Sequence, residues 1–554
     1  MGDRHLSFWP VTAPRQIPLP ETSLWYNLEV SATRFPNKNA LVFYDGLISY
    51  AALKQAAEAI AGYLQQRCGV KPGDRVGIYT QNCPHFVMAF YGILRAGGMV
   101  VPINPMSVSA EVAYMLQDSG AQVIVTTQEL FPQLQPLLDQ GVAKHVIVGA
   151  LSDYVPDDTD LTLPPLVAEP ARSFSGPGVK IFKEVLTEAL TPGPELPSPD
   201  DFAVMPYTSG TTGNPKGCIH THRTVMHSTL ITMQWRPRFQ DECALGALPL
   251  FHVTGMQNAM NGPIFTGGTS VLLPRWDRDV AAKLIARYRI TGWTTVPTMV
   301  VDLLSSPKIA EYDLSSLRAM GGGGAAMPEA IATKLEQVYG LQYIEGYGLS
   351  ETMAPTHINP EHRPKKQCLG IPTSGVDSRV VDPDTLEELP ANQTGEILIH
   401  GPQVFQGYWN RPEATGNTFV EVDGKRFFRT GDLGFVDNDG YFFIVDRLKR
   451  MINASGFKVW PAEIEAKLYA HPGVKEAAII SRPDPRRGET VKAVVVRNEN
   501  ATLEEQELIE WCRGCMSAYK VPRSVEFVDA LPKSGSGKIL WRVLQDKENQ
   551  ATAD

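Results

Sequence analysis

The amino-acid sequence predicts an α/β protein with a large N-terminal domain and a small α+β domain at its C-terminus. Two observations predict this fold class. Short apolar runs alternate with helical patterns through most of the chain, and a compact mixture of helices and strands begins after residue 446. A chain of 554 residues is also too long for one simple core. We therefore expect residues 1–446 and 447–554 to form separate domains.

Several segments of the larger domain show the alternation. The apolar runs at 75–79, 122–126 and 145–148 are typical of buried strands, whereas residues 53–64 place apolar side chains on one helical face. Buried strands separated by helices indicate parallel sheets that are covered on both faces. Residues 154–199 are rich in Pro, Asp and Ser, and we expect a long surface excursion there.

The C-terminal part has its own pattern. Asp437-Asn-Asp-Gly440 separates two apolar runs and predicts a β-hairpin. A helix over 461–470, strands over 477–480 and 491–496, a second helix and a strand near Val525 should follow. About a hundred residues of this kind are enough for a small domain.

Composition excludes several classes of protein. The net charge of −9 leaves no basic surplus for binding a nucleic acid polymer. No apolar run reaches the roughly 20 residues of a transmembrane segment, and residues 1–20 do not resemble a secretory signal. The sparse cysteines favour a reducing, cytoplasmic location. We interpret Cys512 and Cys515 as two cysteines at a helix end, not as a redox or zinc pair.

The strongest chemical signal is a loop at residues 207–217. Glycines at Gly210, Gly213 and Gly217 allow tight turns that present backbone N–H groups, and Lys216 adds a positive charge. The hydroxyl side chains are those of Thr208, Ser209, Thr211 and Thr212. Together they predict a polyphosphate site. The spacing is not that of a Walker P-loop, because two residues separate Gly213 from Lys216 and Gly217 follows the lysine.

With this loop in place, the sequence resembles the acyl-adenylate-forming superfamily of AMP-binding enzymes, and is most similar to bacterial medium- and long-chain fatty acyl-CoA synthetases. The resemblance runs in order over residues 25–545. It is carried by Pro249-Leu-Phe-His252, Gly323-Gly-Ala-Ala326, Glu345-Gly-Tyr-Gly-Leu-Ser-Glu-Thr352, Gly395-Glu-Ile-Leu398, Gly407-Tyr-Trp-Asn410, Arg429-Thr-Gly-Asp432, Asp446-Arg-Leu-Lys449, Ser455-Gly-Phe-Lys458 and Pro532-Lys-Ser-Gly-Ser-Gly-Lys538.

The resemblance implies an acyl-CoA synthetase-like fold, in which a large domain of packed sheets and helices carries a small mobile C-terminal lid. It also implies an acid–thiol ligase. Such an enzyme forms an acyl-adenylate from a carboxylic acid and ATP, transfers the acyl group to CoA, and releases AMP and pyrophosphate. ATP, Mg²⁺ and CoA are the implied cofactor and co-substrates.

Residue roles carry over from the matching motifs. Two anions must meet in this reaction, so cations and oriented donors should dominate the site. Lys538, His252, Thr208 and Glu351 are the expected catalytic residues. Glu351 is the expected Mg²⁺ ligand, with Thr208 as a second candidate. Besides Lys538 and the loop residues Thr208 to Gly213 and Lys216, the nucleotide contacts expected are Gly324, Ala325, Ala326, Glu345, Gly346, Tyr347, Gly348, Thr352, Asp432 and Arg447.

The second half-reaction needs other residues. Lys449 matches the family's hinge between two lid positions, and Ser455, Gly456, Phe457 and Lys458 are the expected CoA-binding segment. The family often has lysines at the positions of Asn453 and Ser455, and this chain departs from that pattern.

The nature of the acid is less determined. His252 stands where amino-acid-activating relatives carry an aspartate, which argues against an α-amino acid substrate. The expected acyl pocket comprises His252, Val296, Gly321, Gly322 and Gly323. The glycine run either leaves a channel open for an alkyl chain or serves only a tight backbone connection.

Several alternatives remain open in the sequence. The acid is a medium- or long-chain fatty acid, or an aryl, branched or other carboxylate. The enzyme is a CoA ligase, a loading enzyme for a carrier protein in trans, or a luciferase-like oxygenase. Only residues 539–554 follow Lys538, so we expect no fused carrier domain. A homodimer is a further option.

Overall fold

The computed structural model describes residues 4–208, 214–324, 327–447, 450, 452–454, 457–484, 488–498, 501–533 and 539–551. The chain divides into two compact units. Among the described residues, the large unit comprises 4–377 and 399–428, and the small unit comprises 378–398 and those from 429 onward. The expected domain border at 446/447 stays a prediction. Residues 429–447 fall in the small unit because β22 (Lys425–Val436) pairs through its second half with β23 (Phe442–Arg447).

A nine-stranded sheet of the large unit has the order β18-β17-β16-β15-β14-β12-β13-β1-β2. Its inner neighbours from β1 to β16 are parallel, and β2, β17 and β18 are antiparallel additions at the edges. The strands are β1 (Asn39–Phe43), β2 (Gly46–Ser49), β12 (Cys243–Gly246), β13 (Thr269–Leu272), β14 (Gly292–Thr295), β15 (Ala319–Gly322), β16 (Tyr343–Leu349), β17 (Ala354–Ile358) and β18 (Ile371–Pro372).

A seven-stranded sheet has the order β11-β8-β4-β3-β5-β6-β7 and is parallel except for β11. The strands are β3 (Arg75–Tyr79), β4 (Met99–Pro102), β5 (Val123–Thr127), β6 (His145–Gly149), β7 (Val179–Ile181), β8 (Phe202–Val204) and β11 (His220–Thr221). The three predicted strands are confirmed as β3, β5 and β6. The excursion at 154–199 is only partly loop, because β7 and the helix α7 (Phe182–Glu188) extend this sheet.

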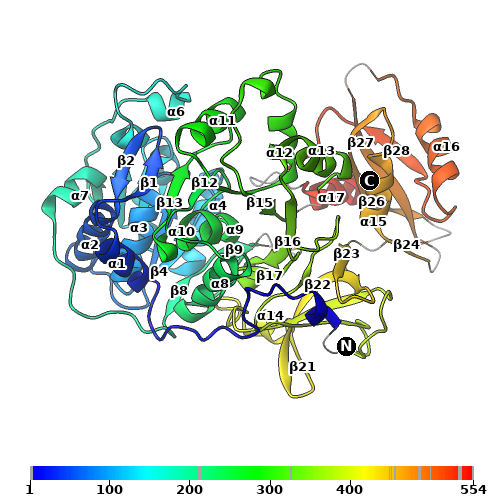
Figure 1. The fold of residues 1–554 in the computed structure, drawn as a ribbon, viewed down its shortest axis with the longest axis horizontal. Helices are drawn as coiled ribbons and strands as arrows, with labels where there is room; N and C mark the ends of the chain where they lie inside the picture. The colour runs from blue at the N-terminus through cyan, green and yellow to red at the C-terminus, as the bar shows by residue number, and fades with distance from the viewer. Residues whose placement is uncertain are drawn as a thin grey trace. The chain divides into compact units, whose positions relative to one another are not determined.

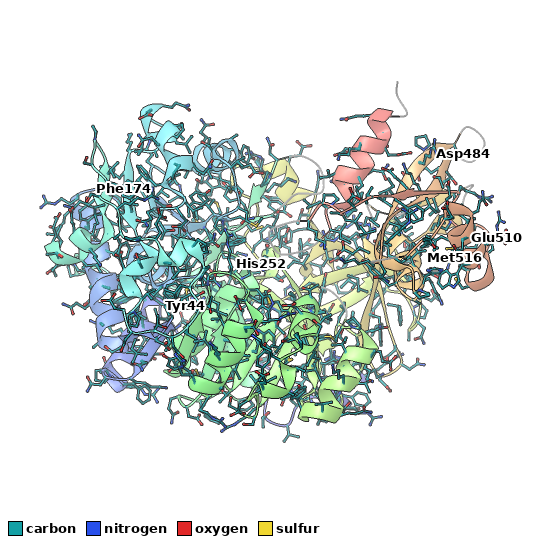
Figure 2. All side chains as sticks on the ribbon, turned by 90° about the horizontal axis from the view of Figure 1, so that it is seen from above. Tyr44, Phe174, His252, Asp484, Glu510 and Met516 are labelled. Carbon is teal, nitrogen blue, oxygen red and sulfur yellow. The ribbon has the colours of Figure 1, made fainter. Side chains whose placement is uncertain are left out.

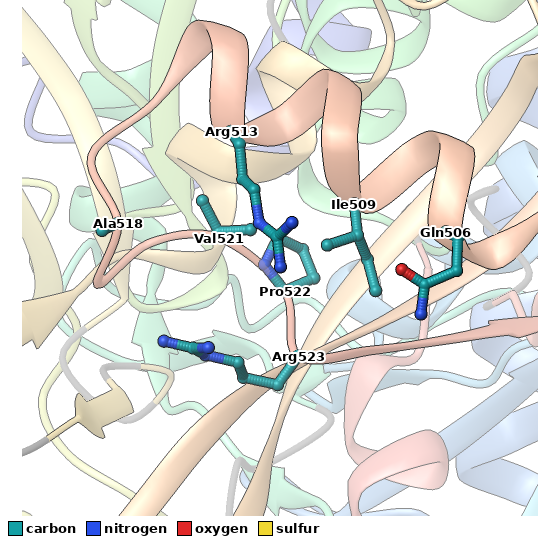
Figure 3. A pocket seen from close by; sticks show the side chains of 7 residues that line it. All are labelled: Gln506, Ile509, Arg513, Ala518, Val521, Pro522 and Arg523. Carbon is teal, nitrogen blue, oxygen red and sulfur yellow. The ribbon is translucent and has the colours of Figure 1, made fainter.

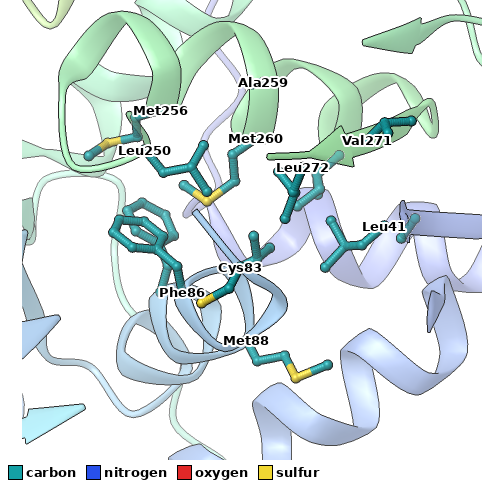
Figure 4. Close-up of a cluster of buried hydrophobic side chains, with 14 of the residues drawn as sticks. Leu41, Cys83, Phe86, Met88, Leu250, Met256, Ala259, Met260, Val271 and Leu272 are labelled. Atoms are coloured by element: carbon teal, nitrogen blue, oxygen red, sulfur yellow. The ribbon is translucent and has the colours of Figure 1, made fainter. Parts of the chain in front are cut away.

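Helices cover both sheets of the large unit (Figure 1). All residues of α3 (Pro84–Arg95) are buried, and its side chains share one core with strands of both sheets. Figure 4 shows Cys83 and Phe86 of this region on the side of Leu250, Met256 and Met260. The other face of the seven-stranded sheet packs on α4 (Ser109–Ser119) and α5 (Phe131–Asp139). Burial on both faces explains the continuous apolar strands.

The remaining helices of the large unit are α1 (Trp25–Arg34), α2 (Tyr50–Gln66), α6 (Pro165–Ala168), α8 (His222–Trp235), α9 (Val253–Met256), the π-helical η3 (Gln257–Asn261), α10 (Gly262–Thr266), α11 (Arg278–Arg287), α12 (Pro297–Leu304), α13 (Glu329–Tyr339) and α14 (Pro412–Gly416). The predicted helix at 53–64 is confirmed as part of α2. Two short ribbons complete the unit: β9 (Tyr207–Thr208) pairs with β10 (Lys216–Gly217), and β21 (Phe419–Val422) pairs with the first half of β22.

The small unit begins with β19 (Asp377–Val381) and β20 (Gly395–His400) and contains the predicted hairpin, in which Asp437 N–H donates to Tyr441 O. Its C-terminal sheet has the order β25-β24-β27-β26, with β28 beside β27. The elements are β24 (Ile452–Ala454), β25 (Phe457–Val459), α15 (Pro461–Leu468), β26 (Val474–Asp484), β27 (Gly488–Arg497), α16 (Glu505–Cys515), β28 (Ser524–Phe527) and α17 (Trp541–Ala551). These match the predicted α+β pattern.

The cysteines and the helix lengths of the described residues can be compared with the sequence. Cys512 and Cys515 both lie in α16 and are free thiols, as expected for helix-end cysteines. No described helix has the length and apolar character that crossing a membrane requires.

Candidate functional site

The two ends of the predicted phosphate loop are held together by a short antiparallel ribbon. Thr208 in β9 pairs with Lys216 in β10, so the hydroxyl-bearing end of the loop lies opposite its cation. Neighbouring tyrosines anchor the ribbon: Tyr207 donates to Asp118 Oδ2 at 2.8 Å, and Tyr114 donates to Pro215 O at 2.9 Å. The loop thus leaves and re-enters the large unit at one fixed place.

Glu351 is tied to the same place through Tyr408. The Tyr408 hydroxyl donates to Glu351 Oε1 at 2.9 Å, and Lys216 Nζ lies 5.1 Å from the centroid of the Tyr408 ring. Burial, and then the negative charge of Glu351, raise the pKa of Tyr408 well above its usual value. The structure therefore places Glu351 at the hydroxyl group of Tyr408 and Lys216 at the face of its ring. Sequence reasoning gave Tyr408 no role, although the motif Gly407–Asn410 contains it.

Glu351 lies in a single 3₁₀ turn after β16, Ser350–Thr352. The buried Thr352 accepts a hydrogen bond from Leu349 N at 2.9 Å and donates to Ala354 O at 3.0 Å, which closes the turn. His220 fixes the turn from outside, since its Nε2 is 2.7 Å from Ser350 O. Burial lowers the pKa of His220 to about 4, so this imidazole is neutral near pH 7.

Tyr347, which the sequence predicts as a platform for adenine, lies in the strand β16. The half-buried Tyr347 lies in it between Gly346 and Gly348, and its ring centroid is 5.7 Å from that of His357. Glu345, expected as a nucleotide contact, has another partner here. Its buried carboxylate accepts from Met327 N at 2.9 Å and from Cys368 N at 3.4 Å, and burial raises its pKa. The side chain of Glu345 therefore orders the backbone around the platform.

The glycine run at the carboxyl end of β15 is packed against its neighbours. A Cβ on Gly321 would lie 2.5 Å from Ile344 O, and one on Gly322 would lie 1.9 Å from Thr295 O. A Cβ on Gly323 would lie 2.4 Å from Gly346 O. The space beside these three glycines is filled by backbone, which favours the tight-connection alternative over an open channel at these positions.

β15 with its glycines lies between β14 and β16, so the predicted residues Val296 and Tyr347 lie near the carboxyl ends of neighbouring strands. Gly322 pairs with Thr295 on one side and with Glu345 on the other. Val296, expected in the acyl pocket, directly follows β14, and Tyr347 continues β16. Crevices at the carboxyl ends of parallel strands are common ligand sites in α/β folds.

His252 is exposed at the N-terminus of α9, where its Nδ1 accepts from Thr254 N at 3.4 Å (Figure 2). The loop before it is anchored by the buried Asn82, whose amide donates to Leu248 O and whose carbonyl oxygen accepts from Leu250 N, both at 2.8 Å. A Cβ on Gly255 would lie 2.2 Å from Pro249 O, so only glycine fits this turn. His252 is thus held in a defined place.

Asp432 belongs to the small unit, where a buried ion pair shapes its turn. Arg447 Nε lies 2.8 Å from Asp432 Oδ1, and Asp432 is almost completely buried. The buried Glu396 accepts from Arg429 Nε at 2.9 Å and from Gly431 N at 3.1 Å. Gly431 adopts φ +67°, a left-handed conformation that favours glycine. Arg429-Thr-Gly-Asp432 is therefore a rigid turn that presents the predicted ribose-binding carboxylate.

The described residues contain no group of three or more His, Cys, Asp or Glu side chains arranged to hold a metal ion. For Mg²⁺ the donor chemistry of Glu351 is suitable, since this ion is commonly held by one or two carboxylates together with substrate phosphates.

Comparison with known proteins decides the family. Residues 28–409 match the family described as AMP-binding enzyme, and residues 463–538 match the AMP-binding enzyme C-terminal domain. The chain belongs to this family.

Relatives of this AMP-binding enzyme match it over nearly its whole length. A long-chain-fatty-acid–CoA ligase of Bacillus subtilis (strain 168) is 36% identical over 98% of both chains. A feruloyl-CoA synthase of an Amycolatopsis species is 35% identical over 91% of this chain and 95% of its own. The crystal structure of ATP-bound MatB from Rhodopseudomonas palustris superposes with a TM-score of 0.84 at 30% identity, covering 96% and 100% of the two chains. The expected superfamily and fold class are confirmed.

Some predicted residues of this AMP-binding enzyme lie outside the described part. They are Ser209, Gly210, Thr211, Thr212, Gly213, Ala325, Ala326, Lys449, Ser455, Gly456 and Lys538. Phe457 and Lys458 are described by their backbone alone, in β25. The roles expected of these residues stay predictions.

A separate cavity of about 340 Å³ lies in the small unit between α16 and residues 518–523 (Figure 3). Ile509, Val521 and Pro522 form its apolar part, and Arg513 and Arg523 supply charge. None of the residues expected in the active site lines it.

Proposed function

We propose that this AMP-binding enzyme is an ATP-dependent acyl-CoA ligase that activates a medium- or long-chain fatty acid. The observation that carries the proposal is the arrangement of Lys216 and Glu351 around Tyr408, beside the ribbon that closes the phosphate loop. A cation and a hard carboxylate placed together suit a magnesium-bound polyphosphate. The long-chain-fatty-acid–CoA ligase of Bacillus subtilis, which matches over almost the full length, supports the choice of acid.

The chemistry follows from the charges. A carboxylate oxygen of the acid attacks the α-phosphorus of ATP, a P–O bond forms, and the bond to pyrophosphate breaks to give the acyl-adenylate. Lys216 and Lys538 offset the negative charge that accumulates when the two anions meet. Magnesium, when held by Glu351 and the phosphates, supplies further charge neutralisation. In this proposal His252 faces the substrate carboxylate.

The second half-reaction uses the thiol of CoA. The thiolate attacks the acyl carbonyl, the bond to the phosphate oxygen of AMP breaks, and the thiol proton passes to solvent. Because one site serves both steps, we propose that the C-terminal segment after residue 449 changes position about a hinge at Lys449. In its second position the segment Ser455 to Lys458 faces CoA. Asp432 and Arg447 bind the ribose of the nucleotide in this proposal.

A second candidate substrate is an aryl carboxylate. The feruloyl-CoA synthase relative supports it, with nearly the same identity as the fatty-acid ligase relative. The close packing at Gly321, Gly322 and Gly323 argues against a channel through those positions, so the acyl tail must take another course along the pocket.

The test is AMP formation with ATP and Mg²⁺ on a panel of medium-chain, long-chain and aryl acids, measured with and without CoA. We expect CoA-dependent AMP release that is strongest for a fatty acid. Strongest turnover with ferulate or benzoate selects the aryl alternative. AMP release that never depends on CoA contradicts the ligase proposal.

A further inference from the structure

The motif Gly407–Asn410 had no function in the sequence, yet its tyrosine touches two residues of the phosphate site. Tyr408 donates its hydroxyl to Glu351 Oε1 at 2.9 Å, and its ring faces Lys216 Nζ at 5.1 Å. The two contacts use different parts of the side chain: the hydroxyl holds an anion, and the electron-rich face holds a cation.

The backbone around Tyr408 connects the same two residues. Phe405 N donates to Glu351 O at 2.8 Å, and Trp409 N donates to Gly217 O at 2.8 Å, directly after Lys216. The backbones of Cys218 and Tyr408 form an isolated antiparallel β-bridge. The segment 405–409 therefore connects, by hydrogen bonds, the turn that carries Glu351 and the strand that carries Lys216.

The side chain of Tyr408 is held in place by neighbours of the segment 405–409. The Phe405 ring packs edge-on against it, with centroids 4.9 Å apart at 69°, and Tyr408 N donates to Thr415 Oγ1 at 3.0 Å. A Cβ on Gly407 would lie 2.6 Å from Thr415 Cγ2, which explains the glycine before the tyrosine. The hydroxyl thus meets Glu351 in one defined geometry.

We propose that Tyr408 is a positioning residue for the magnesium–ATP site. Its hydroxyl orients the Glu351 carboxylate toward the cation, and its ring keeps Lys216 directed at the phosphates. This inference rests on the proposed function, because Glu351 is a metal ligand only in that proposal. Hydrogen-bond partners of metal-binding carboxylates commonly change metal affinity by about 10–100-fold when removed.

Two substitutions separate the roles. Tyr408→Phe removes the hydroxyl and keeps the ring, and Tyr408→Leu removes both. The matched control is Tyr288→Phe, since Tyr288 also donates to a carboxylate, Asp45 Oδ1 at 2.6 Å, in the same unit. The measurements are Mn²⁺ binding with a non-cleavable ATP analogue, followed by water proton relaxation, and the KM values for Mg²⁺ and for the acid.

We expect Tyr408→Phe to weaken Mn²⁺ binding by about 10-fold and to raise the KM for Mg²⁺, while the KM for the acid stays unchanged. Tyr408→Leu should in addition weaken binding of the analogue without metal, because Lys216 loses its support. Tyr288→Phe should match the unsubstituted enzyme in both measurements.

A double substitution guards against a general folding defect. If Tyr408 acts through Glu351, then Glu351→Gln combined with Tyr408→Phe should weaken Mn²⁺ binding no more than Glu351→Gln alone. Additive losses, or normal Mn²⁺ binding by Tyr408→Phe, overturn the inference. Failure of the unsubstituted enzyme to form AMP with any acid overturns the proposed function instead, so the two failures are distinguishable.

Discussion

The ion pair between Glu396 and Arg429 offers a direct test of how the turn before Asp432, the proposed ribose contact, is built. Glu396 is 2% exposed and accepts from Arg429 Nε at 2.9 Å and from Gly431 N at 3.1 Å. Arg429 and Gly431 N donate to different oxygens of Glu396, so Glu396→Gln keeps one acceptor and turns an N–H₂ group toward the other donor. Loss of one hydrogen bond to the charged carboxylate costs about 2 kcal/mol.

This loss should be visible in stability and in nucleotide binding. For a unit of this size, about 2 kcal/mol lowers the Tm of its transition by about 4–8 °C. A looser turn should also misplace Asp432 and raise the KM for ATP by about 10-fold, equivalent to about 1.4 kcal/mol. With 2′,3′-dideoxy-ATP, which lacks both hydroxyls, the substitution should change the KM little.

The assay is pyrophosphate release with each nucleotide, next to a thermal melt. A control is Glu463→Gln, which breaks the ion pair of Glu463 with Lys520 (2.7 Å) elsewhere in the small unit. This variant should lose stability without discriminating between the nucleotides. Equal KM increases for ATP and the dideoxy analogue in Glu396→Gln would refute the positioning role of Glu396.

Three further predictions concern packing, pH and catalysis. Gly322→Ala should lower the Tm sharply, because its Cβ would lie 1.9 Å from Thr295 O, whereas Gly514→Ala, with open space in α16, should raise stability by up to about 1 kcal/mol in thermal melts. The pKa of His220 is about 4, against an ordinary value of 6.5, so the unfolded state binds more protons between these two pH values. The free energy of unfolding should therefore fall by about 3 kcal/mol as the pH drops from 6.5 to 4. His220→Gln should flatten this pH dependence in urea titrations, and an unchanged slope would contradict the lowered pKa of His220. Lys538→Ala should slow acyl-adenylate formation by at least about 100-fold while thioester formation from a supplied adenylate changes little, and full pyrophosphate exchange in this variant would exclude the role.

The features that sequence reasoning anticipated are local in the chain. The strands β3, β5 and β6 are continuous apolar runs, and the hairpin before Phe442 has a turn motif between its strands. The phosphate loop concentrates glycines, hydroxyls and a lysine in one segment. Such signals depend on neighbours in sequence, so a pattern of residues is enough to detect them.

The features that were missed depend on distant partners. Tyr408 meets Glu351 across 57 positions, and Glu396 meets Arg429 across 33. Glu345 carries the expected residue type, but its carboxylate serves backbone groups that lie far away in sequence. The short strand β7 has too few residues to show a period of its own, and it is stabilised by pairing with β6.

The family, the α/β class and the residue types that ATP chemistry requires can be read from the sequence, because they follow from composition and from motifs of adjacent residues. Which side chains hold the motifs in place depends on the folded chain. It also chose between the two explanations of the glycine run at 321–323, since the distance from a Cβ to the next strand is set by sheet pairing, which no local pattern of residues contains.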